Sequence, residues 1–206
     1  MITILDNNNK LNEHKNTLVI TYPRTANIIF GSYPYPDQIH NFILDIKNNL
    51  NLEMKNFTNV KGGMTDWNHF IDKKPFINFM TYLINKHQLS HPNIFEHFLE
   101  KHTVTNAWGN EIKLGDSLNY HTHPCYHGIL YLSEGCDLIL PELNIKITPK
   151  PGDYYIIPPT IIHGFEEYQK EEKRYSLIFN IEEIANKFNY INKLKERDEK
   201  NERKNS

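Results

Sequence analysis

Hydrophobic positions along the chain change their period near residue 102. Between about residues 36 and 101 they recur every three or four positions, which is typical of helices with one apolar face. Pro36 followed by Asp37 is a favourable helix start. Three helices are predicted, at residues 36–50, 75–87 and 92–101, with inward faces formed by Ile39, Phe42, Ile43, Ile46 and Leu50, by Phe76, Phe79, Met80, Leu83 and Ile84, and by Ile94, Phe95, Phe98 and Leu99.

Short runs of β-branched and aromatic residues, separated by turn residues, lie on both sides of these helices. Strands are predicted at residues 17–23, 27–36, 102–113, 118–123, 127–132, 137–141, 143–149, 153–158 and 174–181. Short strands at this spacing are typical of an antiparallel sandwich or barrel. The predicted fold is therefore mainly β with a helical annex (α+β), and its core is a double-stranded β-helix, or jelly roll.

The domain organisation follows from the same pattern. Residues 1–16 are polar and are predicted to be loosely ordered. Residues 17–180 are predicted to form a single domain, with a helical layer at about 36–101 and the jelly-roll core at about 102–180. A terminal helix and a frayed, charged tail are expected over residues 181–206.

Residues 57–70 are predicted to form a loop that contains Gly62, Gly63 and Trp67. Glycine permits hinge motion and tryptophan offers a large contact surface, so this loop is a candidate lid. The alternative is that Trp67 is buried and anchors the helical layer.

Composition limits the classes of function. The chain of 206 residues has 39% hydrophobic and 23% charged residues and a mean hydropathy of -0.61, so no membrane span is predicted. A formal net charge of -2 gives no general attraction to nucleic acid. Cys125 and Cys136 are too few for a disulfide framework, and the first residues lack a secretion signal, so a cytoplasmic location is predicted. The sequence does not indicate an oligomeric state.

Three histidines, His121, His123 and His127, lie within seven positions. Alternation along a strand would place His121 and His123 on one face, and His127 could approach from the neighbouring strand. His163 follows a turn and an apolar strand, where a distal ligand would arrive. A lone histidine is usually structural, but this combination predicts a metal site, and imidazoles suit iron, zinc, copper, nickel or manganese.

A second cluster lies downstream in an apolar strand, where Arg174 and Ser176 would share a face. A planar guanidinium beside a hydroxyl is suited to binding a carboxylate. The alternative for Arg174 is a surface salt bridge with one of four nearby acidic residues, which are Glu166, Glu167, Glu171 and Glu172.

Residues 105–180 resemble the non-haem iron, 2-oxoglutarate-dependent oxygenases of the prolyl-hydroxylase type, and in particular the oxygenases encoded by phages and environmental viruses. The matching elements are Asn106-x-Trp108, His121-x-His123-Pro124, Gly128 to Leu132 with Tyr131, Pro151-Gly152-Asp153, Pro158, His163-Gly164, and Arg174-x-Ser176 through Asn180. The order and spacing of these elements are specific to that family.

The resemblance implies a role for each matching residue. His121 and His163 would bind Fe(II), while Arg174 and Ser176 would hold the distal carboxylate of 2-oxoglutarate with help from Tyr131. His123 stands where the family has Asp or Glu, so a third imidazole would raise the charge of the site by one and favour anionic ligands. His127 is a candidate fourth metal ligand, or else it supports the ligands.

The resemblance also implies a reaction, with His121, His123 and His163 as the catalytic metal ligands. The protein would hydroxylate a substrate with Fe(II) and 2-oxoglutarate, release succinate and CO2, and use ascorbate as a reductant. The substrate remains open between a protein side chain, a nucleobase and a small molecule. If the chain is viral, the expected location is the host cytoplasm.

Two other functions fit the histidines. A cupin-like metalloenzyme has a similar spacing of glycine, histidine and proline, which here is Gly115, His121, His123, His127, Gly152, Pro158 and His163. A non-catalytic metal- or ligand-binding jelly-roll protein is the other alternative. Arg174 and Ser176 favour the oxygenase, because a cupin does not need them.

Overall fold

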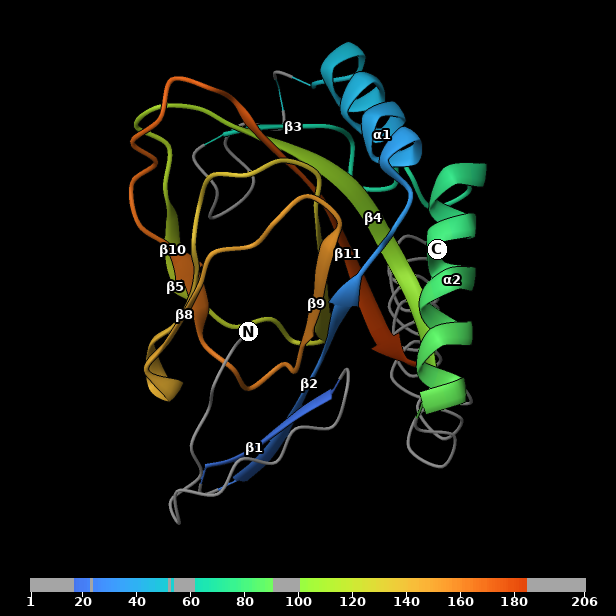
Figure 1. Cartoon of the computed structure of the whole chain (residues 1–206), viewed down its shortest axis with the longest axis vertical. Helices are drawn as coiled ribbons and strands as arrows, with labels where there is room; N and C mark the ends of the chain where they lie inside the picture. The colour runs from blue at the N-terminus through green and yellow to red at the C-terminus, as the bar shows by residue number, and fades with distance from the viewer. Residues whose placement is uncertain (1–16, 23, 52, 54–61, 91–100, 185–206) are drawn as a thin grey trace, which may run out of the picture.

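The computed structural model describes residues 17–22, 24–51, 53, 62–90 and 101–184 (Figure 1). Its helices are α1 (Pro36–Asn48), α2 (Lys74–Ser90) and the short 3-10 helix η2 (Pro141–Leu143). Its strands are β1 (Thr17–Tyr22), β2 (Arg24–Ser32), β3 (Gly63–Met64), β4 (His102–Ile112), β5 (Leu118–His121), β6 (Tyr126–Tyr131), β7 (Leu138–Leu140), β8 (Ile145–Ile147), β9 (Asp153–Ile157), β10 (His163–Phe165) and β11 (Arg174–Glu183).

The strands form two antiparallel sheets. The larger has seven strands in the order β1-β2-β9-β6-β11-β4-β3, and the smaller has four in the order β5-β10-β7-β8. From β4 onward the chain passes repeatedly between the two sheets: β4, β6, β9 and β11 lie in the larger, and β5, β7, β8 and β10 in the smaller. This alternation is the winding of a double-stranded β-helix, so the predicted fold is confirmed.

Side-chain alternation along β11 gives the larger sheet two different faces. Tyr175, Leu177 and Phe179 belong to the core on the helical side, where α1 and α2 cover the sheet (Figure 1). Arg174, Ser176 and Ile178 point the other way and line a cavity between the two sheets. The helices therefore support the sheet from behind, while its opposite face is free to form a site.

The helices bury the faces that the sequence predicts. In α1 the buried residues are Ile39, Phe42 and Ile46. In α2 the fully buried positions include Phe79 and Leu83, which are likewise spaced by four residues. The predicted helix at 92–101 lies outside the described residues. Neither described α-helix is both long enough and apolar enough to span a membrane.

The strand boundaries differ from the predictions in two places that affect the site. β5 ends at His121 rather than at residue 123, because the chain leaves the smaller sheet there and crosses to β6 in the larger. β11 continues to Glu183, so the strand replaces the first residues of the predicted terminal helix. The rest of that helix and the charged tail fall in residues 185–206, outside the described part of the chain. The short strands β3 and β10 were not predicted.

Gly128 on β6 lies directly opposite Phe179 on β11, and a Cβ at residue 128 would overlap the buried Phe179 ring. Because the interior is close-packed, Gly128→Ala is expected to lower the free energy of unfolding by about 1–3 kcal/mol. Chemical denaturation measures this change. Gly63→Ala is a matched control, since its Cβ would meet its nearest neighbour, on Leu50, at 3.4 Å. Equal stability of the two variants would contradict the prediction.

Candidate metal centre and cavity

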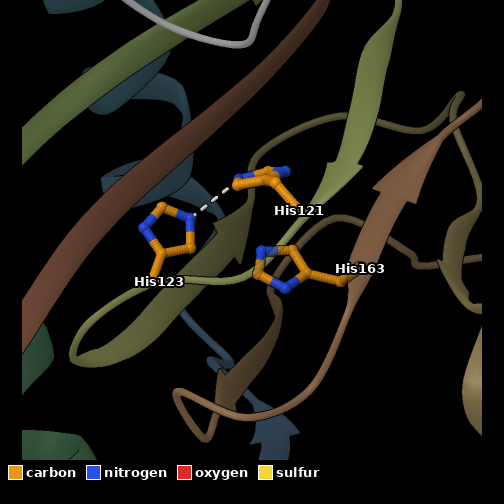
Figure 2. A group of neighbouring side chains, drawn as sticks. All are labelled: His121, His123 and His163. Atoms are coloured by element: carbon orange, nitrogen blue, oxygen red, sulfur yellow. Dashed lines mark hydrogen bonds between the residues drawn. The ribbon is translucent and has the colours of Figure 1, made fainter.

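Three histidines from separate parts of the two-sheet core lie close together (Figure 2), and all three line the cavity. His121 on β5 and His163 on β10 are directly opposite each other in the smaller sheet. His123 lies beyond the end of β5, in the connection to β6. One ligand nitrogen from each lies within 4.8 Å of the other two. The prediction that His121 and His123 share a strand face is wrong, because the irregular connection, not strand alternation, brings His123 to this position.

Backbone carbonyls orient two of the three rings. Nδ1 of His121 donates to Asn119 O at 2.8 Å, and Nδ1 of His163 donates to Ile161 O at 3.1 Å. In each neutral ring this leaves the lone pair on Nε2, the atom available to a metal. Nε2 of His163 is buried and has no hydrogen-bond partner. A metal ion would give this atom the partner that it lacks.

The spacing of the ligand atoms also fits a metal ion. Nε2 of His121 and Nε2 of His123 are 2.9 Å apart. Two nitrogens that each lie about 2.1 Å from one ion, at right angles to each other, are about 3 Å apart. His121 and His123 therefore fit neighbouring positions around one ion, and the nitrogen of His163, within 4.8 Å of both, lies close enough to join them with a small shift.

Burial keeps the rings of His123 and His163 in the neutral form that binds metals. It lowers the pKa of His123 to about 3, and positive charge on His121 or His163 would lower this pKa further. Burial likewise lowers the pKa of His163 to about 4, even though the carbonyl of Ile161 acts in the opposite direction. Near neutral pH no proton competes with a metal ion for these two rings.

His127 is not part of the three-nitrogen group. It lies on β6, the next strand along the chain, and its ring approaches those of His123 and His163 as predicted, but from the larger sheet and not from a strand that pairs with β5. Its ring stacks on His123 with 3.8 Å between centroids and 8° between planes. Its Nδ1 lies 3.2 Å from Oδ1 of Asn180, and because an amide oxygen only accepts, Nδ1 donates. His127 therefore packs behind His123, and burial holds its pKa well below the usual range.

The cavity that these histidines share has a volume of about 390 Å³ and lies between the two sheets. Trp67 and Trp108 line it and pack edge to face, with 4.6 Å between their ring centroids. Trp67 is half-buried and packs against Trp108 on β4, so the expectation that it is buried and anchors the helical layer is wrong, whereas the candidate lid stays a prediction.

Arg174 also lines the cavity, and only 4% of it is exposed. Its guanidinium carbon lies 4.8 Å from the centroid of the Tyr131 ring and 5.3 Å from that of Phe165. Nε has no hydrogen-bond partner, and no ion pair joins Arg174 to a carboxylate within the described residues. The four glutamates considered as surface partners are all exposed. A buried guanidinium without a counter-charge is a ready site for an anionic ligand.

A row of polar side chains runs beside Arg174 across three strands. Ser176 on β11 is directly opposite Tyr131 on β6 and Asn110 on β4, and all three line the cavity. Burial raises the pKa of Tyr131 to about 12, although nearby Arg174 opposes this shift, so its phenol is a hydrogen-bond donor at neutral pH. The side-chain oxygen of Asn110 is buried and unpaired. The sequence prediction missed Asn110, although its even spacing from Trp108 on one predicted strand could have indicated it.

No known protein family matches the sequence, and no curated protein matches it. Solved structures with the same fold do match. The viral collagen prolyl hydroxylase from Paramecium Bursaria Chlorella virus-1, in a 2OG complex, superposes with a TM-score of 0.55 at 12% identity, over 75% of this chain and 94% of that one. A prolyl-4-hydroxylase from Pseudomonas putida gives 0.55 at 12% identity, over 75% and 91%.

HygX from Streptomyces hygroscopicus, with nickel and 2-oxoglutarate bound, gives a TM-score of 0.53 at 10% identity, over 75% of this chain and 82% of that one. At such low identity the likeness concerns the fold alone. The chain thus has the double-stranded β-helix fold of the prolyl-hydroxylase-like 2-oxoglutarate oxygenases, as predicted.

Proposed function

We propose that the protein is an Fe(II)- and 2-oxoglutarate-dependent oxygenase, which hydroxylates its substrate and releases succinate and CO2. One observation carries the proposal: three converging imidazoles and a buried arginine without a carboxylate partner among the described residues line the same cavity. The imidazoles suit Fe(II), and the arginine suits a carboxylate. 2-Oxoglutarate contains both a keto-acid end that chelates a metal and a distal carboxylate.

Each residue has a role in this proposal. His121, His123 and His163 would hold Fe(II), which supplies oxygen activation when it is bound. Arg174 would donate to the distal carboxylate through its planar fork, with Ser176 and Tyr131 as further donors. The rings of Trp67 and Trp108 would exclude water from the cavity. His127 would hold the His123 ring in place through their stacked contact.

A cupin-type metalloenzyme is less well supported. It would use the same histidines but would leave the buried Arg174 guanidinium without a counter-charge among the described residues. A buried charge without a counter-charge is costly, so an anionic ligand that pairs with Arg174 explains the arrangement better.

The test is the conversion of 2-oxoglutarate to succinate. Purified protein is incubated with Fe(II), ascorbate as the reductant, 2-oxoglutarate and oxygen, and succinate is quantified by mass spectrometry. Slow turnover is expected even without the substrate, because 2-oxoglutarate can be converted to succinate without hydroxylation of a substrate. A protein treated with a chelator is the control. If Fe(II) and 2-oxoglutarate bind without oxygen but no succinate forms when oxygen is added, the protein is a binding protein on an oxygenase scaffold.

Removal of either auxiliary donor should weaken 2-oxoglutarate binding moderately. Ser176→Ala and Tyr131→Phe each delete one hydrogen bond, which is worth about 1 kcal/mol, or roughly fivefold in Kd. Calorimetric titration of 2-oxoglutarate into the metal-loaded variants measures the loss. Tyr155→Phe is a matched control, because Tyr155 packs against Tyr131 but does not line the cavity. Unchanged affinity in both variants would place the cosubstrate elsewhere.

A further inference from the structure

The charge of the cavity depends on the residue at position 123. Besides four histidines, the cavity is lined by three titratable or charged residues, namely Tyr131, Asp137 and Arg174. Tyr131 is a neutral phenol, because burial raises its pKa to about 12. The described residues thus offer the cavity one cation and one anion.

The anion, Asp137, already has a partner. Its Oδ2 lies 3.0 Å from Nζ of Lys146, and its Oδ1 accepts a 2.5 Å hydrogen bond from Thr148. Burial acts to raise the pKa of this carboxyl, but the bonds from Thr148 and Lys146 lower it overall, so Asp137 remains a carboxylate. This ion pair has no net charge and leaves nothing to balance a metal ion.

The rest of the wall near the histidines carries no compensating charge. Trp108 on β4, Ile178 on β11 and Ile129 on β6 are directly opposite one another across the larger sheet and form an apolar band. His127 and Asn180, which contact each other, are both neutral. No carboxylate within the described residues belongs to the three-histidine group.

The net charge of the loaded cavity rests on the proposed function, because it includes the charges of Fe(II) and 2-oxoglutarate. A carboxylate at position 123 would leave a divalent metal, dianionic 2-oxoglutarate and Arg174 in balance. His123 is neutral, so the same assembly keeps one net positive charge in a buried cavity. An unbalanced buried charge is unfavourable unless a counter-charge accompanies it.

We propose that the primary substrate of this protein is an anion, and that its negative charge lies beside His123 and supplies the counter-charge missing from the ligand set. The cavity volume of about 390 Å³ is within the usual range of small-molecule sites, about 300–1,000 Å³, so one cavity serves both the cosubstrate and a small anionic group. Acidic small molecules are therefore the substrate class, or larger molecules whose reacting part carries an acidic group.

The test compares two ligands and two side chains that are nearly equal in shape but differ in charge. The ligands are acetate and acetamide, and the side chains are Asp and Asn at position 123. Protein loaded with Fe(II) and saturated with 2-oxoglutarate is titrated without oxygen in chloride-free buffer, and binding is followed by calorimetry and by the visible absorption of the iron chelate. Saturation with 2-oxoglutarate prevents acetate from binding at Arg174.

Wild type is expected to bind acetate at least tenfold more tightly than acetamide, and His123→Asn should keep that preference. His123→Asp should reduce it to less than about threefold, because the carboxylate already balances the charge. Equal affinities in wild type, or the same preference in the Asp and Asn variants, would overturn the proposal. If the variants fail to fold or to retain Fe(II), the two ligands still decide it in wild type.

The same titrations separate this inference from the proposed function. Binding of Fe(II) and 2-oxoglutarate is measured first, and failure of both to bind wild type would refute the proposed function and the anionic substrate together. If both bind but acetate has no advantage, only the anionic substrate is refuted.

Discussion

His163→Ala is expected to reduce the affinity for Fe(II) at least ~100-fold, which is beyond the loss typical of residues that merely support a ligand. Nε2 of His163 is buried and unpaired, and only 1% of the residue is exposed, so no other side chain or water can replace it readily. His121→Ala should behave in the same way, because His121 is the cross-strand partner of His163. Equilibrium dialysis followed by metal analysis measures the retained iron.

The matched control is His40→Ala, which removes an exposed imidazole from α1, on the helical side of the larger sheet. It should leave iron binding unchanged. His123→Ala is expected to lose most of the affinity, whereas His127→Ala should lose about tenfold, since its ring only supports His123. Circular dichroism checks that each variant is folded. Full iron retention in His163→Ala would contradict the assignment of this residue to the metal.

How much of this site the sequence could predict depends on the element. Alternation along β11 is regular, so the sequence predicted correctly that Arg174 and Ser176 share one face. His123 is different. It reaches the other two histidines only because residues 122–125 carry the chain from one sheet to the other. Spacing alone cannot describe such a connection, and the rule of alternation gave a correct grouping for a wrong reason.

Asn110 illustrates a second limit. Its proximity to Ser176 is a matter of register between β4 and β11, which are more than sixty residues apart in the sequence. Register is set by the packing of whole strands, not by local pattern. The three-residue strand β10 was missed for a similar reason, because so short a segment is stabilised by its neighbours β5 and β7 and has little pattern of its own.

Arg174→Ala is expected to weaken 2-oxoglutarate binding by about 2–5 kcal/mol, which is roughly 30-fold to several thousand-fold in Kd. The guanidinium is held between the rings of Tyr131 and Phe165, so it is already oriented before a ligand arrives. Its loss removes the only cation that lines the cavity within the described residues. Calorimetric titration of 2-oxoglutarate into Fe(II)-loaded protein without oxygen measures the change.

Lys170→Ala is the control for a general loss of positive charge, because Lys170 is exposed and does not line the cavity. It should change the Kd less than about twofold, since exposed charges are well screened. Arg174→Lys should recover only part of the affinity, because an ammonium cannot reproduce the planar fork. Iron retention should remain at the wild-type level in all three variants, since Arg174 does not belong to the three-nitrogen group.

The combination of these results discriminates between the oxygenase and the cupin-type metalloenzyme, while the formation of succinate separates the oxygenase from a binding protein. An oxygenase requires Arg174 for the cosubstrate and the histidines for the metal, so Arg174→Ala should lose 2-oxoglutarate and keep iron, whereas His163→Ala should lose iron. A cupin-type metalloenzyme would lose iron in His163→Ala but would show the same weak response to 2-oxoglutarate with or without Arg174. Equal affinity of wild type and Arg174→Ala for 2-oxoglutarate would therefore favour the cupin-type function, and the buried guanidinium would then need a different anionic partner.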